Sequence, residues 1–204
     1  MADKTGICNL SLSHLGISTE IANVETERSA EAAACRRFYD QSLLEALRDF
    51  PNPFLIVTED LGLVSDNTDD ENAEWSYSYR YPANCAKAIR IPSGYRNETP
   101  ESRVPYRIMS DSSGALILTD KENARLEYAK TSDEPDKWAA DFVMAFSLLL
   151  AFYIAPRLTA GDPYKLGERA YRAYLMSMNK SRANAVGEEQ SEQPTDAPSI
   201  RARD

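Results

Sequence analysis

The feature that most constrains this chain is an almost continuously apolar segment in its last third. Between Ala139 and Ala155 the only charged side chain is Asp141. A helix that is apolar on every side lies in a membrane or is covered by protein on all sides. This segment is shorter than the about 20 residues of a spanning helix, and Pro156 follows it directly. We therefore expect no membrane contact, and a core helix over 138–157 around which the chain folds.

Three other segments show the spacing of helices. Apolar residues recur at intervals of three and four over 5–15, 27–49 and 164–185, which places them on one face of each helix. Thr5 is expected to cap the first helix. Pro51 ends the second, because its ring cannot continue the helical hydrogen bonds.

The middle of the chain changes to a period of two. Trp75, Tyr77, Tyr79 and Tyr81 alternate with polar residues, which predicts a half-buried strand with an aromatic row on one face. Further strands are expected over 54–58, 87–91, 106–109, 115–119 and 124–129. The last three, separated by short polar turns, predict a three-stranded antiparallel meander.

This order predicts an α+β fold. Residues 1–50 and 132–186 supply the N- and C-terminal helices of one bundle, and residues 51–131 form a β-rich middle insert of antiparallel strands. Residues 187–204 contain almost no apolar side chain except Ile200, so we expect a flexible, extended C-terminal tail.

Composition excludes several classes of protein. The 204 residues include 23 Lys and Arg against 32 Asp and Glu, a net charge of −9, which argues against a general nucleic-acid binder. Cys8, Cys35 and Cys85 lie far apart in the sequence and form no Cys-x-x-Cys pair. We therefore expect neither a disulfide framework nor a zinc site, and a reducing compartment. The polar start of the chain predicts no secretory signal.

The sequence offers no evident catalytic, cofactor or metal site. His14 is the only histidine, and no Asp or Glu lies three or four residues from it, so a packed histidine is expected. The acidic loop 66–71 lacks the central Gly and distal Glu of a calcium loop. No Gly-rich loop that could cradle a phosphate precedes a helix.

Two segments remain as candidate binding surfaces. The row of Trp75, Tyr77, Tyr79 and Tyr81 could stack bases or sugars, but Arg80 is the only interleaved cation, so core packing or a subunit interface is favoured. In the tail, an isolated apolar residue stands beside two arginines that could anchor it to a partner. These anchor candidates are Ile200, Arg201 and Arg203.

Several segments, in this order, resemble one protein family. They are 7–16 (ICNLSLSHLG), 30–40, 44–54, 75–85 (WSYSYRYPANC), 117–120, 126–128 and 142–159. Together they resemble the head–tail adaptor (connector) proteins of tailed bacteriophages, the group that includes tail tubular protein A-like chains. Two positions depart from that pattern: Asn52 stands where Trp is expected, and Asn84 where Asp is usual.

The resemblance implies a structural protein of the virion, without enzymatic activity or cofactors, at the head–tail junction. It implies a homo-oligomeric ring, typically of 12 copies, which binds beneath the portal protein, contacts a tail tube or nozzle protein and continues the DNA channel. Such a chain is made in the cytoplasm of the host bacterium. An acidic lumen would let genomic DNA slide without specific binding, because it repels phosphate.

The residues themselves leave two other functions open. A tail-associated cell-wall hydrolase would need a carboxylate pair, for which Glu59, Asp60 and the acidic loop are the available groups. A small regulator that binds a host protein would need only an exposed surface.

Overall fold

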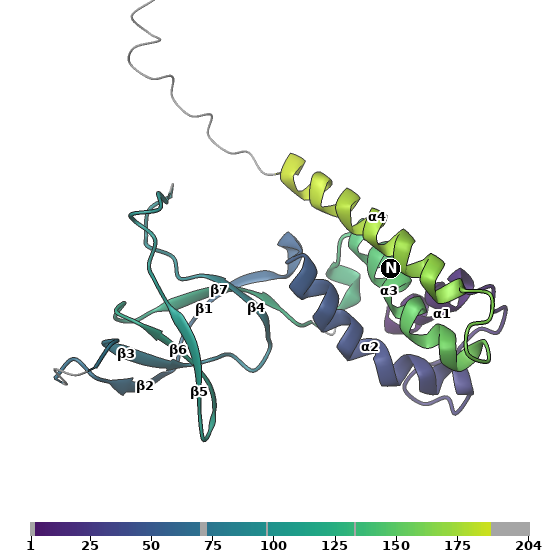
Figure 1. Ribbon diagram of the computed structural model, residues 1–204, viewed down its shortest axis with the longest axis horizontal. Coiled ribbons are helices and arrows are strands. Elements are labelled where there is room, and N and C mark those ends of the chain that lie inside the picture. Colours follow the sequence, from purple (N-terminus) through teal and green to yellow (C-terminus); the bar gives the residue numbers. More distant parts are fainter. Residues whose placement is uncertain (1–2, 70–72, 97, 133, 189–204) are drawn as a thin grey trace, which may run out of the picture.

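A computed structural model of the chain describes residues 3–69, 73–96, 98–132 and 134–188. Its helices gather on one side of the molecule and its strands on the other (Figure 1). The helices are α1 (Lys4–His14), α2 (Ala30–Asp49), α3 (Ala140–Leu158) and α4 (Leu166–Glu188), with short 3₁₀ helices η1 (Pro53–Leu55) and η2 (Pro135–Lys137). The strands are β1 (Ile56–Asp60), β2 (Leu63–Asp66), β3 (Tyr77–Arg80), β4 (Cys85–Arg90), β5 (Arg107–Asp111), β6 (Gly114–Thr119) and β7 (Arg125–Lys130). The predicted α+β class, with a bundle built from both ends of the chain, is confirmed.

The apolar helix α3 is the centre of the bundle. Eleven of its 19 residues are buried, and α1, α2 and α4 all pack against it. Its length and composition would also suit a membrane-spanning helix. Here its apolar surface is covered by the three neighbouring helices instead. Aromatic rings reinforce this packing: Tyr39 meets Phe146 edge-on at 5.1 Å, and Trp138 lies 5.6 Å from Phe146. Edge-to-face pairs of this kind add about 0.5–1.5 kcal/mol each beyond burial.

Short polar side chains fix where the first two helices begin. The Asp3 carboxylate accepts a hydrogen bond from the Gly6 amide at 2.8 Å, and the Ser29 hydroxyl accepts one from the Ala32 amide at 3.2 Å. Each satisfies an amide that has no partner within its helix. The helices therefore start at residues 4 and 30 rather than at 5 and 27. The prediction that Thr5 caps the first helix was wrong.

The C-terminal helices also differ from the prediction at their ends. The core helix begins at Ala140, because Pro135 opens the separate turn η2. The helix α4 begins at Leu166, where the Asp162 carboxylate accepts hydrogen bonds from two backbone amides of its first turn. It continues to Glu188, so the predicted flexible tail lies almost entirely outside the described residues.

The strands form two antiparallel sheets, with the orders β1-β7-β4 and β2-β3-β6-β5. The predicted meander over 106–129 was therefore wrong. The strands β5 and β6 do form a hairpin, but β7 crosses to the centre of the other sheet. The cause is that β3 occupies the second edge of β6 along its whole length, from Tyr77 opposite Thr119 to Arg80 opposite Leu116.

The segment Leu63–Asp66 was not predicted as a strand. It has only two apolar residues and runs into the acidic loop, so its own pattern is weak. It becomes the strand β2 because it pairs with β3, with Leu63 opposite Tyr79. The predicted strands over 54–58 and 87–91 are each shifted by about two residues, to β1 and β4.

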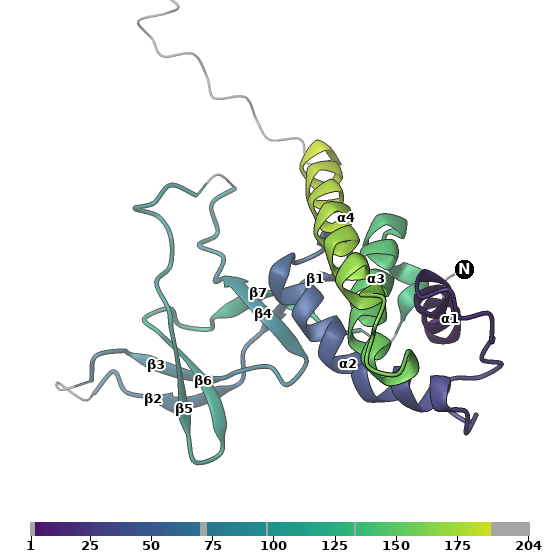
Figure 2. The same cartoon turned by 45° about the vertical axis from the view of Figure 1, so that its right-hand side comes forward.

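The β insert has a small core of its own and is attached to the bundle through the three-stranded sheet. The buried residues of this second core are Tyr79, Ile91, Ile117, Ala124, Leu126 and Tyr128. In contrast, Ala86 of β4 and Ala129 of β7 belong to the helical core. The Lys87 ammonium donates a hydrogen bond to the carbonyl of Arg48 in α2 at 2.8 Å. The four-stranded sheet thus lies away from the helices (Figure 2).

Asn52, one of the two positions that depart from the pattern of the resembled family, lies at the junction between the helical bundle and the β insert. Asn52 is buried, and its side-chain oxygen accepts a hydrogen bond from the Phe54 amide at 3.1 Å. The residue therefore caps η1 and turns the chain from α2 into β1.

The packing around α3 predicts that substitutions of its buried residues lower the free energy of unfolding much more than substitutions of its exposed residues. We expect Phe146→Ala to lower the free energy of unfolding by about 3–5 kcal/mol, because it opens a cavity among three aromatic rings. Met144→Ala on the same helix should change it by less than about 0.5 kcal/mol, because Met144 is exposed. Urea denaturation followed by circular dichroism measures both, and equal losses would contradict this packing.

Candidate interaction surfaces

The aromatic row lies mainly inside the β insert. The strand β3 covers Tyr77–Arg80, shorter than predicted. Tyr79 is buried in the second core, and Tyr77 and Tyr81 pack against it from the same strand and the turn that follows. The Tyr79 hydroxyl donates to the Lys121 carbonyl at 2.9 Å. These rings therefore stabilise the sheet and present little free surface for stacking a base.

Trp75 departs from that row. It precedes β3, lies half-buried and is not part of the second core. Its indole nitrogen is buried and makes no hydrogen bond within the described part of the chain. The alternation of aromatic residues therefore predicted the strand correctly, but Trp75, the first residue of the row, lies outside it.

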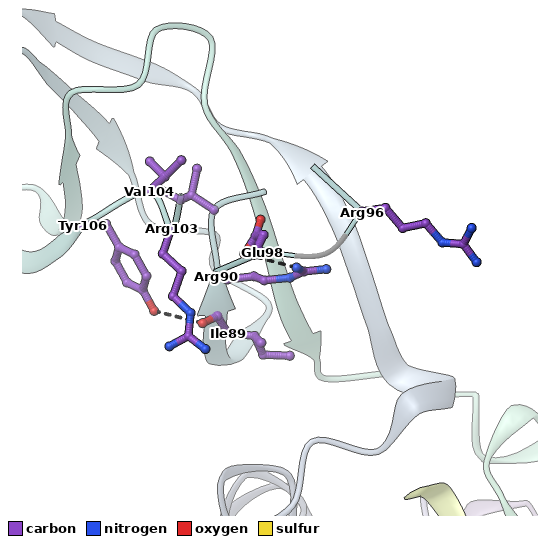
Figure 3. A pocket seen from close by; sticks show the side chains of 8 residues that line it. Ile89, Arg90, Arg96, Glu98, Arg103, Val104 and Tyr106 are labelled. Atoms are coloured by element: carbon purple, nitrogen blue, oxygen red, sulfur yellow. Dashed lines mark hydrogen bonds and ion pairs between the residues drawn. The ribbon is translucent and has the colours of Figure 1, made fainter. Parts of the chain in front are cut away.

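A surface cleft of about 670 Å³ lies beside β4 (Figure 3). One wall is the end of β4, and the other is the segment that leads to β5. Its lining residues are Ile89, Arg90, Ile91, Arg96, Glu98, Arg103, Val104 and Tyr106. An isolated β-bridge between Ile91 and Val104 joins the two walls.

Ion pairs fix the charged groups of this cleft. The Arg90 guanidinium lies 3.3 Å from the Glu98 carboxylate and 2.9 Å from that of Glu127. Glu98 also accepts hydrogen bonds from the amide and hydroxyl of Ser93, both at 2.8 Å. These hydrogen bonds and the nearby Arg90 lower the pKa of Glu98. A carboxylate with a lowered pKa stays ionised and is a poor general acid.

The described lining of the cleft shows no catalytic arrangement. The Arg103 side chain extends past Tyr106 toward Ile89, while Arg96 points away from the cleft (Figure 3). None of the eight lining residues is a Ser, Cys, Thr or His, so the described lining provides no nucleophile with an adjacent base. Sequence reasoning missed this cleft, because its arginines are spread through a polar segment without periodicity.

His14 contacts a serine but not in a catalytic arrangement. Its Nε2 lies 3.0 Å from the hydroxyl of Ser147, which donates a hydrogen bond to the Met144 carbonyl at 2.8 Å. Ser147 is fully buried in α3, so substrate cannot reach it. Burial lowers the pKa of His14, so the ring is neutral at pH 7. Among the described residues no group of three His, Cys, Asp or Glu side chains could hold a metal ion.

Two of the cysteines, distant in sequence, meet in the bundle. Cys8 of α1 and Cys35 of α2 are both buried. A hydrogen bond between the two thiols and burial raise the pKa of Cys8. A protonated, buried thiol reacts slowly, which is consistent with a packing role for Cys8.

The carboxylates considered for hydrolysis take part in ion pairs. The Tyr128 hydroxyl donates to Glu59 at 2.6 Å, and Lys130 lies 3.4 Å from the same carboxylate. Both contacts lower the pKa of Glu59. Asp60 pairs with Arg125 at 2.9 Å.

In the acidic loop, residues 70–72 lie outside the described part of the chain, as do the tail candidates Ile200, Arg201 and Arg203.

Large apolar side chains are exposed in adjacent pairs on three elements. The residues are Leu63 and Val64 on β2, Ile108 and Met109 on β5, and Leu175 and Met176 on α4. Single exposed apolar residues are ordinary, whereas adjacent pairs at the two edges of one sheet are typical of surfaces that meet other protein. Sequence analysis did not single out these pairs, because exposure depends on which strands become edges.

Comparison with known proteins adds no identification. No family model matches the chain, and no curated protein matches it.

The neutral His14 predicts a pH effect on stability. A half-buried base whose pKa is lowered stabilises the fold above the pKa of the unfolded state, about 6.5, and this contribution is lost as the pH falls. We expect the thermal midpoint to fall between pH 7.5 and 5.5. His14→Gln, which retains a polar group near Ser147, should flatten that dependence, because the chain has no other histidine. An unchanged slope in the variant would contradict this assignment.

Proposed function

We propose that the protein is a structural head–tail adaptor of a tailed bacteriophage, which forms a ring beneath the portal and continues the DNA channel into the tail. The observation that carries the proposal is the architecture: helices from both ends of the chain share one core, and an antiparallel β insert leaves the bundle between α2 and α3. The ordered segments that carry the resemblance fall on both the helical bundle and the β insert.

The distribution of exposed apolar residues supports the ring. A ring with one kind of subunit needs a head-to-tail interface, in which two different surfaces of each copy meet. The four-stranded sheet has two such surfaces, because its edge strands β2 and β5 both expose large apolar side chains.

The charge of the chain fits a channel for DNA. A net charge of −9 in each copy would be multiplied in a ring, and acidic groups around a lumen repel phosphate. DNA would then pass without adhering. Within the β4 cleft, Arg90 is already paired with two carboxylates.

The geometry favours the adaptor over the cell-wall hydrolase. A hydrolase of this kind needs one carboxyl group with a raised pKa to donate a proton. Glu59 has the opposite shift, since Tyr128 and Lys130 stabilise its charged form.

The deciding experiment is to mix the purified protein with its cognate portal ring and image the product. We expect a second ring, of about the portal's symmetry, stacked coaxially on the portal. Turnover of purified cell-wall material without portal binding would favour the hydrolase instead. Binding to a host protein as a monomer, measured by light scattering, would favour the regulator.

Removal of the tail tests how the ring would attach. Deleting residues 189–204 should weaken portal binding at least tenfold, because Ile200, Arg201 and Arg203 are the proposed anchors. The thermal midpoint should stay unchanged, because α4 continues to Glu188 without the tail. Exchanging both arginines for Gln in the full chain is the matched variant. Normal portal binding by the truncated chain would remove the tail from the docking surface.

A further inference from the structure

The four-stranded sheet ends in two unpaired apolar edges. Its outer strands are β2 and β5, and within the described residues neither makes backbone hydrogen bonds on its outer side. Proteins that stay monomeric usually protect such edges with charges, prolines or a covering segment. Here Arg107 and Asp111 place charges at the ends of β5, and β2 has a register irregularity between Leu63 and Ser65. Between those features β5 still exposes Ile108 and Met109 at consecutive positions, and β2 exposes Leu63 and Val64.

One row of side chains crosses all four strands on the same face. In the observed register Leu63 lies opposite Tyr79, and Ile117 lies opposite both Tyr79 and Ile108. Residues directly opposite one another in antiparallel strands share a face. The two inner members are buried, at 2% exposure for Tyr79 and 0% for Ile117. The two end members are open, at 57% for Leu63 and 50% for Ile108.

The direction of the strands allows this row to continue in a second copy. Four antiparallel strands in one sheet leave the two edge strands antiparallel to each other. When such a sheet is repeated head-to-tail by rotation, β5 of one copy lies beside β2 of the next in the antiparallel sense. A straight continuation of the row would place Ile108 opposite Leu63 of the neighbouring copy. Leu63 is the first residue of β2, and it pairs with Tyr79 just before the register irregularity between Leu63 and Ser65.

We infer that β5 of each copy pairs with β2 of the next, so that the four-stranded sheets join into one continuous sheet around the ring. This inference rests on the proposed ring, and it specifies the contact between neighbouring copies. Backbone hydrogen bonds along the two edges would supply affinity, and the Leu63–Ile108 contact would set the register.

The contact can be tested by disulfide trapping in rings assembled on the portal. Directly opposite strand residues have Cα atoms about 4.5–5.5 Å apart, within the range of a disulfide. On oxidation, the double variant Leu63→Cys with Ile108→Cys should give a ladder of covalent multimers on a non-reducing gel. A mixture of the two single variants should stop at dimers, because each copy then offers one new thiol.

Three controls define the background. Each single variant alone should give no ladder, since the contact joins residue 63 to residue 108 and not like to like. The single variants also report any reaction of the half-buried Cys85. The pair Thr58→Cys with Ile108→Cys should give no ladder, because Thr58 is an exposed residue on the edge of the other sheet.

Hydrogen exchange on the unmodified protein provides a second measurement that does not depend on how the variants fold. The outward-pointing amides of 63–66 and 107–111 should exchange at least tenfold more slowly in the ring than in the free chain. The outer edge of β1 should show no such change.

The outcomes separate the two proposals. Rings that form on the portal without a ladder and without edge protection would overturn the joined sheet and leave the adaptor function standing. Failure of the unmodified protein to form a ring on the portal would overturn the adaptor function itself.

Discussion

The burial of α3 determines the arrangement of the whole molecule. Its residues are apolar on nearly all sides, so one or two neighbouring helices cannot cover it. α1 and α2 come from the start of the chain and α4 from its end, and all three contact α3. Because both ends are held in one bundle, the middle of the chain must leave and return at one side. The position of the β insert is thus a consequence of how α3 is covered.

This arrangement divides the insert into a fixed part and a free part. The three-stranded sheet places Ala86 and Ala129 in the helical core, and Lys87 hydrogen-bonds to α2. The four-stranded sheet packs only on the second, smaller core. Within the described residues its outer edges therefore have no strand partner. A ring of identical copies would supply those partners without any additional segment.

The sequence predicted the buried elements much better than the surfaces. The aromatic alternation at Tyr77 and Tyr79 identified β3, because those side chains face the small core of the β insert. The cleft beside β4 and the contact between Cys8 and Cys35 were not foreseen. Both depend on segments brought together by the fold, and no local pattern of spacing records such contacts. The tail candidates stay predictions, since residues 189–204 lie outside the described structure.

By itself the sequence determined that the chain has an apolar central helix, amphipathic helices on both flanks and a β-rich middle, because hydrophobic periodicity is a local property of the chain. The tertiary structure decided which strands pair. The segments 115–119 and 124–129 have similar patterns, yet one lies at the centre of each sheet. Strand pairing depends on competition among all available edges, and that competition leaves β2 and β5 exposed. Only the tertiary structure decides whether Leu63 and Ile108 lie in interior strands or in edge strands.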